Sequence, residues 1–397
     1  MITTAQTILL LAFGCYVLWI VFIHACTWRY FARPNPYPPS AAYAPAVSII
    51  KPTKGVDQSA FENFASFCEQ TYTGEYELVF CVEDVADPAV PVITRVIDAY
   101  PHRNVRLVFS DVNDTRSFGK LKNMIAGVEA SAYDVIIFSD SDARVGPMFL
   151  QETVPCLQDP VVGLAFAAPA YGGAANWAAA LRSLFVNALV LRITTLCVLG
   201  VFRGAIGTTM VMRKTVLWEI GGLAQFGWQI SDDISLARAI HEHGLRVHLL
   251  AQPVHIVHRY DSFVGWWWHV QRWLVMTRRY WPMLFVLMNL PDLAFWWSFL
   301  YVGIALLSNQ SLVFALLLML AVLATTLVSA AVVNAQVIRN GQLWRFLWLV
   351  PFQEAVRLPL VAYSWMTNAV IWRGRKMHVN RDCSVRMLPL RTTHNNV

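Results

Sequence analysis

The sequence predicts an α/β domain with a mostly parallel sheet, joined to helices that cross a membrane or lie along its surface. Short apolar runs alternate with helix-like stretches between residues 47 and 261, which is the pattern of a parallel sheet covered by helices. Long uncharged apolar runs lie on both sides of this part of the chain. Of the 397 residues, 56% are hydrophobic and 14% are charged, whereas soluble proteins carry roughly a quarter charged residues.

The first apolar run, residues 7–27, is uncharged and long enough to cross a bilayer as a helix. A signal peptide is the alternative, but no basic segment precedes the run and no small-residue cleavage site follows it. We therefore expect an amino-terminal anchor at 1–28. Arg29 and Arg33 follow it, so the positive-inside rule places the amino terminus outside and the next domain in the cytoplasm. Its prolines make 29–46 a stiff linker.

The cytoplasmic domain is expected at 47–261 and begins with a βαβ unit. Apolar strands are predicted at 47–50, 78–82, 105–109, 135–138 and 210–212, and helices at 61–68, 92–99, 121–130 and 235–243. This alternation predicts a parallel sheet of nucleotide-binding type. The sequence lacks the Gly-x-Gly-x-x-Gly fingerprint of dinucleotide enzymes, so NAD is not expected.

Two carboxylates, Asp140 and Asp142, directly follow the strand at 135–138. Ligands of open α/β sheets bind at the carboxyl ends of the strands. Two acids placed so close repel each other unless a positive group lies between them, and a hard divalent cation that carries phosphate oxygens meets this need. Asp and Ser are also common in turns. The Asp-Ser-Asp run therefore leaves a Mg²⁺ or Mn²⁺ site and a plain polar turn both open.

Further charged side chains are expected at the same edge of the sheet. Asp84 follows its strand as Asp140 does, and there it would contact a uracil or a ribose; a loop acid or a helix cap is the alternative. The tight turn after the first strand is basic, and Lys51 and Lys54 in it are candidates for contact with the nucleotide. Lys120 at a helix start is a candidate for a base or phosphate contact, although a solvated helix face explains a lone lysine equally well.

An acid pair, Asp232 and Asp233, precedes the helix at 235–243. Ser231 or Asp232 would cap this helix in the ordinary way. A functional interpretation needs a carboxylate near the sheet edge that accepts a proton from an alcohol. Because only one of two adjacent acids can point inward, we choose Asp233 as that base.

Tryptophans and arginines gather in residues 262–283, just before a long apolar segment. Such clustering is typical of an interfacial helix with an aromatic belt. Arg272 can in addition form a fork on a diphosphate, and Trp273 can wall an acceptor site. Residues 176–200 are apolar too, but a span there would leave the two halves of the domain on opposite sides of the membrane. We therefore expect a helix that lies in the interface or lines an acceptor groove.

The carboxyl-terminal part, 284–372, is predicted to hold transmembrane and re-entrant helices. Residues 284–307 and 312–333 are two spans joined by a short uncharged loop. Residues 346–372 are apolar but contain two prolines and charged side chains between basic flanks. A re-entrant or interfacial helical pair satisfies the charge rule better there than a full crossing. The basic tail, 373–397, is expected in the cytoplasm.

Net charge and cysteine usage restrict the partners. The formal charge of +6 suits a protein that lies against an anionic leaflet of the lipid bilayer. We expect no nucleic-acid partner, because the soluble part has no long basic run with interleaved aromatics. The seven cysteines are scattered without a close pair, which predicts reduced cytosolic thiols rather than a disulfide framework or a zinc site.

An ordered set of five motifs resembles the ceramide glucosyltransferase family and its bacterial relatives, including the glycosyltransferases of hopanoid biosynthesis. The motifs are Lys51–Asp57, Cys81–Pro88, Asp140–Asp142, Asp232–Asp233 and His269–Trp273. The similarity covers nearly the whole chain, including the amino-terminal anchor and the carboxyl-terminal membrane region. It implies a nucleotide-sugar-binding α/β domain of the glycosyltransferase-A type.

The resemblance also implies roles for individual residues. By this likeness Asp84 is the first family aspartate, which contacts the nucleotide, and Asp140 is the second, at the metal. Asp233 is the third, the base. Arg272 and Trp273 end the (Gln/Arg)-x-x-Arg-Trp signature.

The chain departs from the family pattern at two positions. His269 stands where Gln or Arg is usual in the signature. Asp142 completes an Asp-x-Asp, where animal members are similar only at the first acid. This second departure makes metal dependence easier to expect here.

The expected function is the inverting transfer of one sugar from a UDP-sugar to the hydroxyl of a lipid, with UDP-glucose and ceramide as the preferred pair. Asp233 would deprotonate the hydroxyl, and Mg²⁺ or Mn²⁺ on Asp140 and Asp142, helped by Arg272, would stabilise the leaving diphosphate. The enzyme would lie in a bacterial inner membrane or in an endomembrane, with its catalytic domain in the cytoplasm.

Three alternatives stay open. N-acetylglucosamine or another sugar could go to a hopanoid or a glycerolipid by the same mechanism. A processive polysaccharide synthase has the same acids, but three or so crossings are too few for a pore. A non-enzymatic receptor that binds nucleotide-sugar is the third, and the complete set of acids argues against it.

Overall fold

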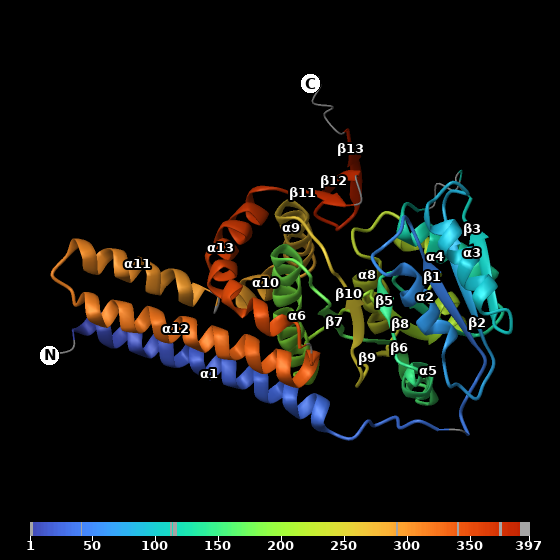
Figure 1. Cartoon of the computed structure of the whole chain (residues 1–397), viewed down its shortest axis with the longest axis horizontal. Helices are drawn as coiled ribbons and strands as arrows, with labels where there is room; N and C mark the ends of the chain where they lie inside the picture. The colour runs from blue at the N-terminus through green and yellow to red at the C-terminus, as the bar shows by residue number, and fades with distance from the viewer. Residues whose placement is uncertain are drawn as a thin grey trace. The chain divides into compact units, whose positions relative to one another are not determined.

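The computed structural model describes residues 3–40, 42–111, 113, 117–290, 293–339, 341–372 and 375–389 (Figure 1). The chain forms two compact units, which are treated separately below. The sheet unit comprises Tyr30–Gly172 and Leu196–Arg259. The helical unit comprises Met1–Arg29, Gly173–Thr195 and Tyr260–Val397. Residues 173–195 thus belong to the helical unit, although they lie within the stretch 47–261 that the sequence assigns to one domain.

The sheet unit is built on a seven-stranded sheet with the order β3-β2-β1-β4-β8-β6-β9. Its strands are β1 Val47–Pro52, β2 Tyr76–Val82, β3 Asn104–Phe109, β4 Val135–Ser139, β6 Val162–Phe166, β8 Thr209–Arg213 and β9 Arg246–Leu249. All neighbouring strands are parallel except β8, which is antiparallel to both β4 and β6. The predicted α/β fold with a mostly parallel sheet is confirmed.

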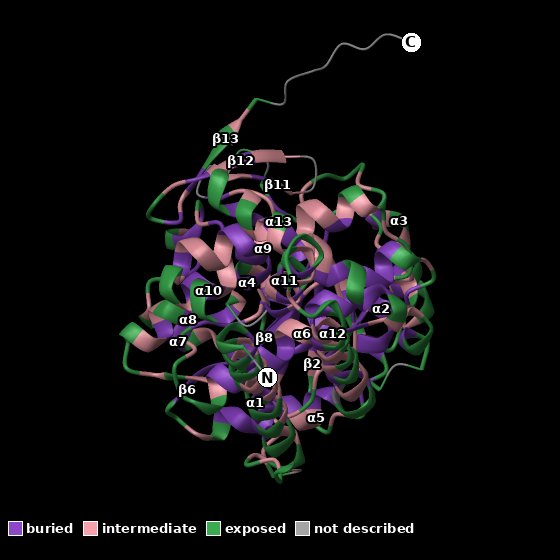
Figure 2. Ribbon diagram, turned by 90° about the vertical axis from the view of Figure 1, so that its left-hand side faces the viewer, coloured by how far each residue is buried: buried purple, intermediate pink, exposed green. Residues whose placement is uncertain are grey.

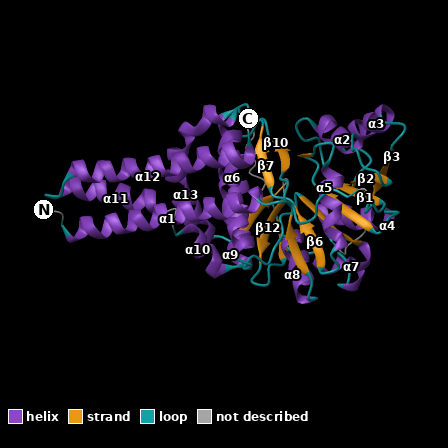
Figure 3. Ribbon diagram, turned by 90° about the horizontal axis from the view of Figure 1, so that it is seen from below, coloured by secondary structure: helices purple, strands orange, loops and turns teal. Residues whose placement is uncertain are grey.

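Helices cover this sheet because its central strands are buried on both faces. Every residue of β1 and β4 is buried, as expected for strands that read as continuous apolar runs. The helices of the unit are α2 Ala60–Cys68, α3 Ala89–Ala99, α4 Lys120–Ala130, α5 Phe149–Thr153, α7 Lys214–Glu219 and α8 Asp232–Glu242, with 3₁₀ turns at Val154–Gln158 and Ala224–Phe226. Figure 3 shows helices on both sides of the orange strands.

Close packing fixes α4 against the sheet at Gly127. A Cβ at this position would overlap Ile50 Cγ2 and lie 2.8 Å from Cys81 Sγ. The backbone of α4 therefore rests directly on β1 and β2. This contact sets the position of the first residue of the helix, Lys120.

A second, three-stranded sheet has the order β5-β10-β7. Its strands are β5 Ala143–Arg144, β7 Pro169–Gly172 and β10 Val254–Val257. Strand β5 begins directly after Asp142, and β4 ends directly before Asp140. The turn that carries both acids is therefore held by a different sheet at each end.

The helical unit contains α1 Thr4–Ala32, most of α6 Trp177–Val198, α9 Phe263–Tyr280, α10 Pro282–Asn289, α11 Ala294–Leu307, α12 Leu312–Val333, a π-helical turn Asn334–Ile338, a 3₁₀ stretch Leu343–Leu349 and α13 Val350–Met366. A small antiparallel sheet follows, made of β11 Ala369–Trp372, β12 Arg375–Val379 and β13 Val385–Leu388. The predicted helical stretch up to residue 372 is wrong at its end, because residues 369–372 form β11. Residues 1–2, 41, 112, 114–116, 291–292, 340, 373–374 and 390–397 of the predicted segments lie outside the described residues.

Three helices of the described residues are long and apolar enough to cross a membrane: Thr4–Ala32, Trp177–Val198 and Leu312–Gln336. Helices α10 and α11 pass the same test as a pair bent by 53°, which makes up to four spans. Only 11% of the most apolar window of α1 and 17% of that of α12 is buried in the protein, against 72% for α6. Exposed residues, green in Figure 2, recur along α1. These helices fit a membrane protein in which α1 and α12 present apolar surface outward.

Helices α1 and α12 run side by side in the same direction (Figure 1). Leu9 packs near Ala315, Tyr16 near Val322 and Ile23 near Val333, so residue numbers increase in the same direction along both helices. The Tyr16 and Thr326 hydroxyls are hydrogen-bonded at 2.7 Å. This pairing joins the first and the late apolar segments of the chain.

Candidate active site

The turn of Asp140 and Asp142 is anchored through the backbone. Asp140 N–H donates to Thr208 O at 3.0 Å, and Ala143 N–H donates to Asp140 O at 3.2 Å. The first bond follows from the pairing of β4 with β8, in which Ser139 lies opposite Thr209. In an antiparallel pair the end of one strand meets the start of the other. The residues just before β8 therefore lie beside the acids just after β4.

Lys120 is the cation at the centre of the site. Its Nζ lies 2.6 Å from Asp140 Oδ1 and 3.6 Å from Asp232 Oδ2, and it donates to Gly207 O at 3.0 Å. Burial alone would lower the pKa of Lys120, but the carboxylates of Asp140 and Asp232 outweigh it and raise the pKa. Lys120 is therefore charged and joins the Asp-x-Asp turn to the acid pair, two features that lie far apart in the sequence.

Asp233 lies in the first turn of α8, which begins three residues earlier than the sequence predicts. Its Oδ2 accepts the Gly207 N–H at 2.6 Å, and its Oδ1 accepts the Ile234 N–H at 2.8 Å and the hydroxyl of Ser231. Burial, followed by the charge of Asp232, raises the pKa of Asp233, although Ser231 and Lys120 oppose the shift. A carboxylate with a raised pKa is a stronger proton acceptor once it is ionised.

The neighbouring Asp232 is placed differently. Its Oδ2 is buried and accepts no hydrogen bond within the described part of the chain. Asp232 instead forms an ion pair with Lys120, whose Nζ lies 3.6 Å from this oxygen. Of the two adjacent acids, Asp233 is thus the one held by backbone N–H groups, and Asp232 acts on it electrostatically.

Gly207 fits between the acid and the lysine because it has no side chain. A Cβ here would lie 3.0 Å from Asp233 Oδ2 and 3.2 Å from Lys120 Nζ. The glycine belongs to the small-residue turn before β8, whose composition permits a close backbone approach. The turn closely approaches the side chains of Asp233 and Lys120, a contact that sequence reasoning did not identify.

Lys51 lies beneath the Asp140 turn and is completely buried. Its Nζ donates to Asp140 O at 2.8 Å and to Ser139 Oγ at 3.4 Å, and it lies 3.8 Å from the centre of the Phe67 ring. Burial lowers the pKa of Lys51 to about 7, although nearby carboxylates, that of Asp140 first, oppose the shift. The sequence predicts that Lys51 contacts the nucleotide; its complete burial and its bond to Asp140 O suit instead a residue that holds the turn in position.

The loops after β1 and β2 carry the other predicted contacts of the nucleotide. Asp84 is exposed, and its Oδ1 accepts the Ala86 N–H at 2.9 Å. Lys54 Nζ lies 3.9 Å from Glu83 Oε2. The two loops are joined by Asp87, whose carboxylate accepts the Gly55 N–H at 2.9 and 3.0 Å.

Arg272 and Trp273 lie on α9 in the helical unit. The guanidinium of Arg272 lies 5.1 Å from the centre of the Trp372 ring, and the rings of His269 and Trp273 are 5.0 Å apart. Gln271 donates to Ala369 O at 2.9 Å, which ties α9 to β11. The signature residues are thus packed against aromatic side chains of their own unit.

The acids at the end of β4 have the chemistry of a site for a hard cation. Carboxylate oxygens are preferred by Mg²⁺, which is commonly held by one or two carboxylates together with substrate phosphates. Within the described ranges no group of three or more His, Cys, Asp or Glu side chains could hold a metal. A metal held by Asp140 and Asp142 would need further ligands, and the oxygens of a bound diphosphate have the required chemistry.

Acids at the carboxyl edge of a mostly parallel sheet, together with apolar helices of membrane-spanning length, define a membrane-associated α/β enzyme. Residues 7–385 match Glycosyl transferase family 21, and the chain belongs to this family. It is therefore a glycosyltransferase, and the resemblance to ceramide glucosyltransferases is confirmed.

Similar proteins are found among curated relatives and among solved structures. Ceramide glucosyltransferase 1 of Caenorhabditis elegans is 23% identical over 92% of this chain and 79% of its own length. Ceramide glucosyltransferase of Komagataella phaffii is 31% identical over 31% of this chain and 24% of its own length. The mannosyltransferase PcManGT of Pyrobaculum calidifontis, solved with GDP-Man and Mn²⁺, has a TM-score of 0.49 and 19% identity, covering 88% of this chain and 96% of its own.

Proposed function

We propose that the protein transfers one sugar from a UDP-sugar to the hydroxyl of a membrane lipid, with inversion at the anomeric carbon. UDP-glucose and ceramide are the proposed pair. Glucose and ceramide are supported by the names of the family relatives, and UDP by the resemblance of the motifs. The observation that carries the mechanism is the chain of contacts from Asp140 through Lys120 and Gly207 to Asp233. It supports the proposal that a base and a donor-binding turn share one site.

Asp233 is the proposed base. It takes the proton of the acceptor hydroxyl while the oxygen forms its bond to the anomeric carbon, and the bond from that carbon to the UDP oxygen breaks. Attack from the face opposite the leaving UDP inverts the configuration, and no covalent glycosyl-enzyme is needed. The raised pKa of Asp233 increases its strength as the acceptor of this proton.

Asp140 and Asp142 would hold the Mg²⁺ or Mn²⁺, which when bound stabilises negative charge on the diphosphate. Asp84 and Lys54 are proposed to contact the nucleotide, and Lys51 to position the metal-binding turn. Lys120 neutralises Asp140 before the donor binds, and its charge then favours the incoming diphosphate.

Two residues of the helical unit complete the proposal. Arg272 is proposed to bind the diphosphate and Trp273 to line the acceptor site. These two roles rest on family membership, since the signature lies within the matched residues 7–385.

The protein is proposed to lie in a bacterial inner membrane or an endomembrane. Its catalytic domain would face the cytoplasm and its amino terminus the opposite side, because Arg29 and Arg33 follow the first apolar helix. Transfer of N-acetylglucosamine or another sugar to a hopanoid or glycerolipid is the second candidate. A processive synthase is less favoured, because the described residues hold three or at most four candidate spans.

A lipid-product assay on detergent-purified protein tests this function. UDP-glucose and UDP-N-acetylglucosamine are offered separately with ceramide or a hopanoid acceptor, with and without Mn²⁺. A glucosylceramide product that is lost on chelation supports the proposal, metal included. A hopanoid product favours the second candidate, and hydrolysis without transfer contradicts a lipid acceptor.

Substitution of the base tests the mechanism within the same assay. Asp233→Asn is expected to lower turnover by roughly 100-fold or more, the contribution typical of a general base, while UDP-sugar still binds. Asp98→Asn, an exposed acid on α3, is the matched control. Near wild-type turnover of Asp233→Asn would show that another group is the base.

A further inference from the structure

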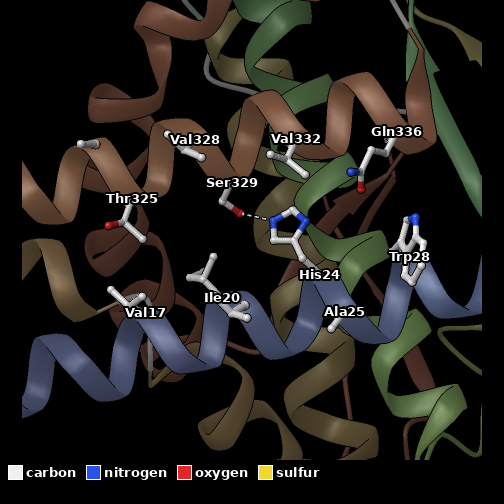
Figure 4. A pocket seen from close by; sticks show the side chains of 12 residues that line it. Val17, Ile20, His24, Ala25, Trp28, Thr325, Val328, Ser329, Val332 and Gln336 are labelled. Carbon is white, nitrogen blue, oxygen red and sulfur yellow. Dashed lines mark hydrogen bonds between the residues drawn. The ribbon is translucent and has the colours of Figure 1, made fainter.

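A cavity of about 600 Å³ lies between α1 and α12 in the helical unit (Figure 4). Its wall on α1 includes Val17, His24 and Trp28, and its wall on α12 includes Val328 and Val332. These residues are four or seven positions apart, about one or two turns of an α-helix, so each helix contributes one continuous face. We call this cavity the α1–α12 groove.

The groove is apolar except for a small number of hydrogen-bonding groups. His24 Nε2 and Ser329 Oγ are hydrogen-bonded at 2.8 Å, and Figure 4 shows this pair on facing helices beside the cavity. An ionisable side chain on a helix of membrane-spanning length is costly, and such residues commonly mark a functional site. The bond from Tyr16 to Thr326 differs, because neither of these residues lines the groove.

The surroundings of the two helices indicate what fills the groove. Helices α1 and α12 are long and apolar enough to span a membrane, and less than a fifth of each apolar window is buried, at 11% and 17%. In a membrane, the outward surface of both helices would face lipid. A groove on such a surface is accessible from the bilayer to a hydrocarbon chain.

The position of the groove along α1 matches the part of a lipid directly below its head group. From Val17 to Trp28 it extends about 16 Å at the rise of an α-helix, or about half of the hydrocarbon core. Trp28 is followed by Arg29, and tryptophan next to arginine is typical of the membrane interface. His24 lies about one turn deeper, where a group just below a lipid head group would meet it.

We propose that the α1–α12 groove binds the lipid acceptor. One of its hydrocarbon chains would lie along the apolar walls, and an amide or hydroxyl beneath its head group would exchange hydrogen bonds with His24 and Ser329. This inference rests on the proposed lipid-glycosylating function and adds to it the binding site and the class of lipid that the site selects. Imidazole and hydroxyl groups both donate and accept, so they match an amide or hydroxyl better than an ester, which only accepts.

A matched pair of variants tests the site. Ala25→Trp fills the groove from α1, whereas Leu18→Trp places the same bulk at an exposed position on α1 that does not line the groove. We expect Ala25→Trp to raise the KM for ceramide roughly tenfold, equivalent to about one lost hydrogen-bonded contact. The KM for the UDP-sugar and kcat should stay unchanged, and Leu18→Trp should behave as the wild type.

Photolabelling provides a measurement that does not depend on turnover. A ceramide probe with a diazirine in its acyl chain should label peptides of α1 and α12 in the wild type and in Leu18→Trp, but not in Ala25→Trp. Equal labelling of both variants would overturn the inference. Equal labelling by a diacylglycerol probe, which has no amide, would overturn the proposed selection. Retained labelling without any sugar transfer would contradict the proposed function instead.

Discussion

Replacement of Lys120 by methionine removes the ammonium that lies 2.6 Å from Asp140 and keeps a side chain of similar length. The ammonium neutralises one of the two acids that would bind the metal. It also donates to the carbonyl of Gly207, and the N–H of the same glycine donates to Asp233. The variant should therefore change metal affinity and turnover in opposite directions.

The magnitude follows from the geometry. The ammonium and a divalent cation would compete for the Asp140 carboxylate. Solvent screens the ion pair, because the side chains of Lys120 and Asp140 are 17% and 33% exposed, so the pair is worth about 1 kcal/mol. This free energy corresponds to roughly five- to tenfold in affinity. Loss of the Gly207 contact displaces Asp233, and a misplacement of about 1 Å costs up to roughly 100-fold in rate.

We therefore expect Lys120→Met to bind Mn²⁺ roughly five- to tenfold more tightly while kcat falls by roughly 10- to 100-fold. Free Mn²⁺ measured by electron paramagnetic resonance gives the affinity, with and without UDP. Arg246→Met is the matched control, because Arg246, the first residue of β9, forms a partly exposed ion pair with Asp159. Unchanged or weaker Mn²⁺ binding by Lys120→Met would refute the competition between lysine and metal. Absence of Mn²⁺ binding by the wild type would contradict the metal site itself.

Three further variants test the same network. Gly207→Ala should lower kcat about tenfold or more with little effect on the KM of the donor, because the added Cβ would lie 3.0 Å from Asp233 Oδ2; unchanged kcat in steady-state assays would contradict this. Asp232→Asn should move the acidic limb of the kcat profile to lower pH. The charge of Asp232 raises the pKa of Asp233, so removal of that charge lets Asp233 ionise at a lower pH. A shift of the limb to higher pH would be inconsistent with this assignment. Lys51→Met should weaken Mn²⁺ binding, the opposite of Lys120→Met, because Lys51 donates to the Asp140 carbonyl and holds the turn without pairing with its carboxylate; tighter binding in the same titration would exclude this role.

Local sequence patterns predicted much of the fold correctly. Strands β1, β2, β3 and β4 were found because buried parallel strands are short continuous apolar runs with clear turn residues at their ends. The end of the carboxyl-terminal apolar stretch was misread, since β11 is a four-residue strand directly after a helix. Such a short apolar segment has no periodicity that separates strand from helix.

The sequence by itself determined the fold class of the protein, the edge of the sheet where its acids lie and the segments that suit a membrane, because these follow from local periodicity, length and composition. Only the tertiary structure decided which residues of the candidate site contact one another. Lys120 reaches Gly207 across 87 residues, and Gly207 reaches Asp233 across 26. These contacts exist because β8 enters the sheet antiparallel to β4 and brings its preceding turn beside Asp140. Strand direction and pairing are long-range choices set by the packing of the whole sheet, and no stretch of the sequence encodes them alone.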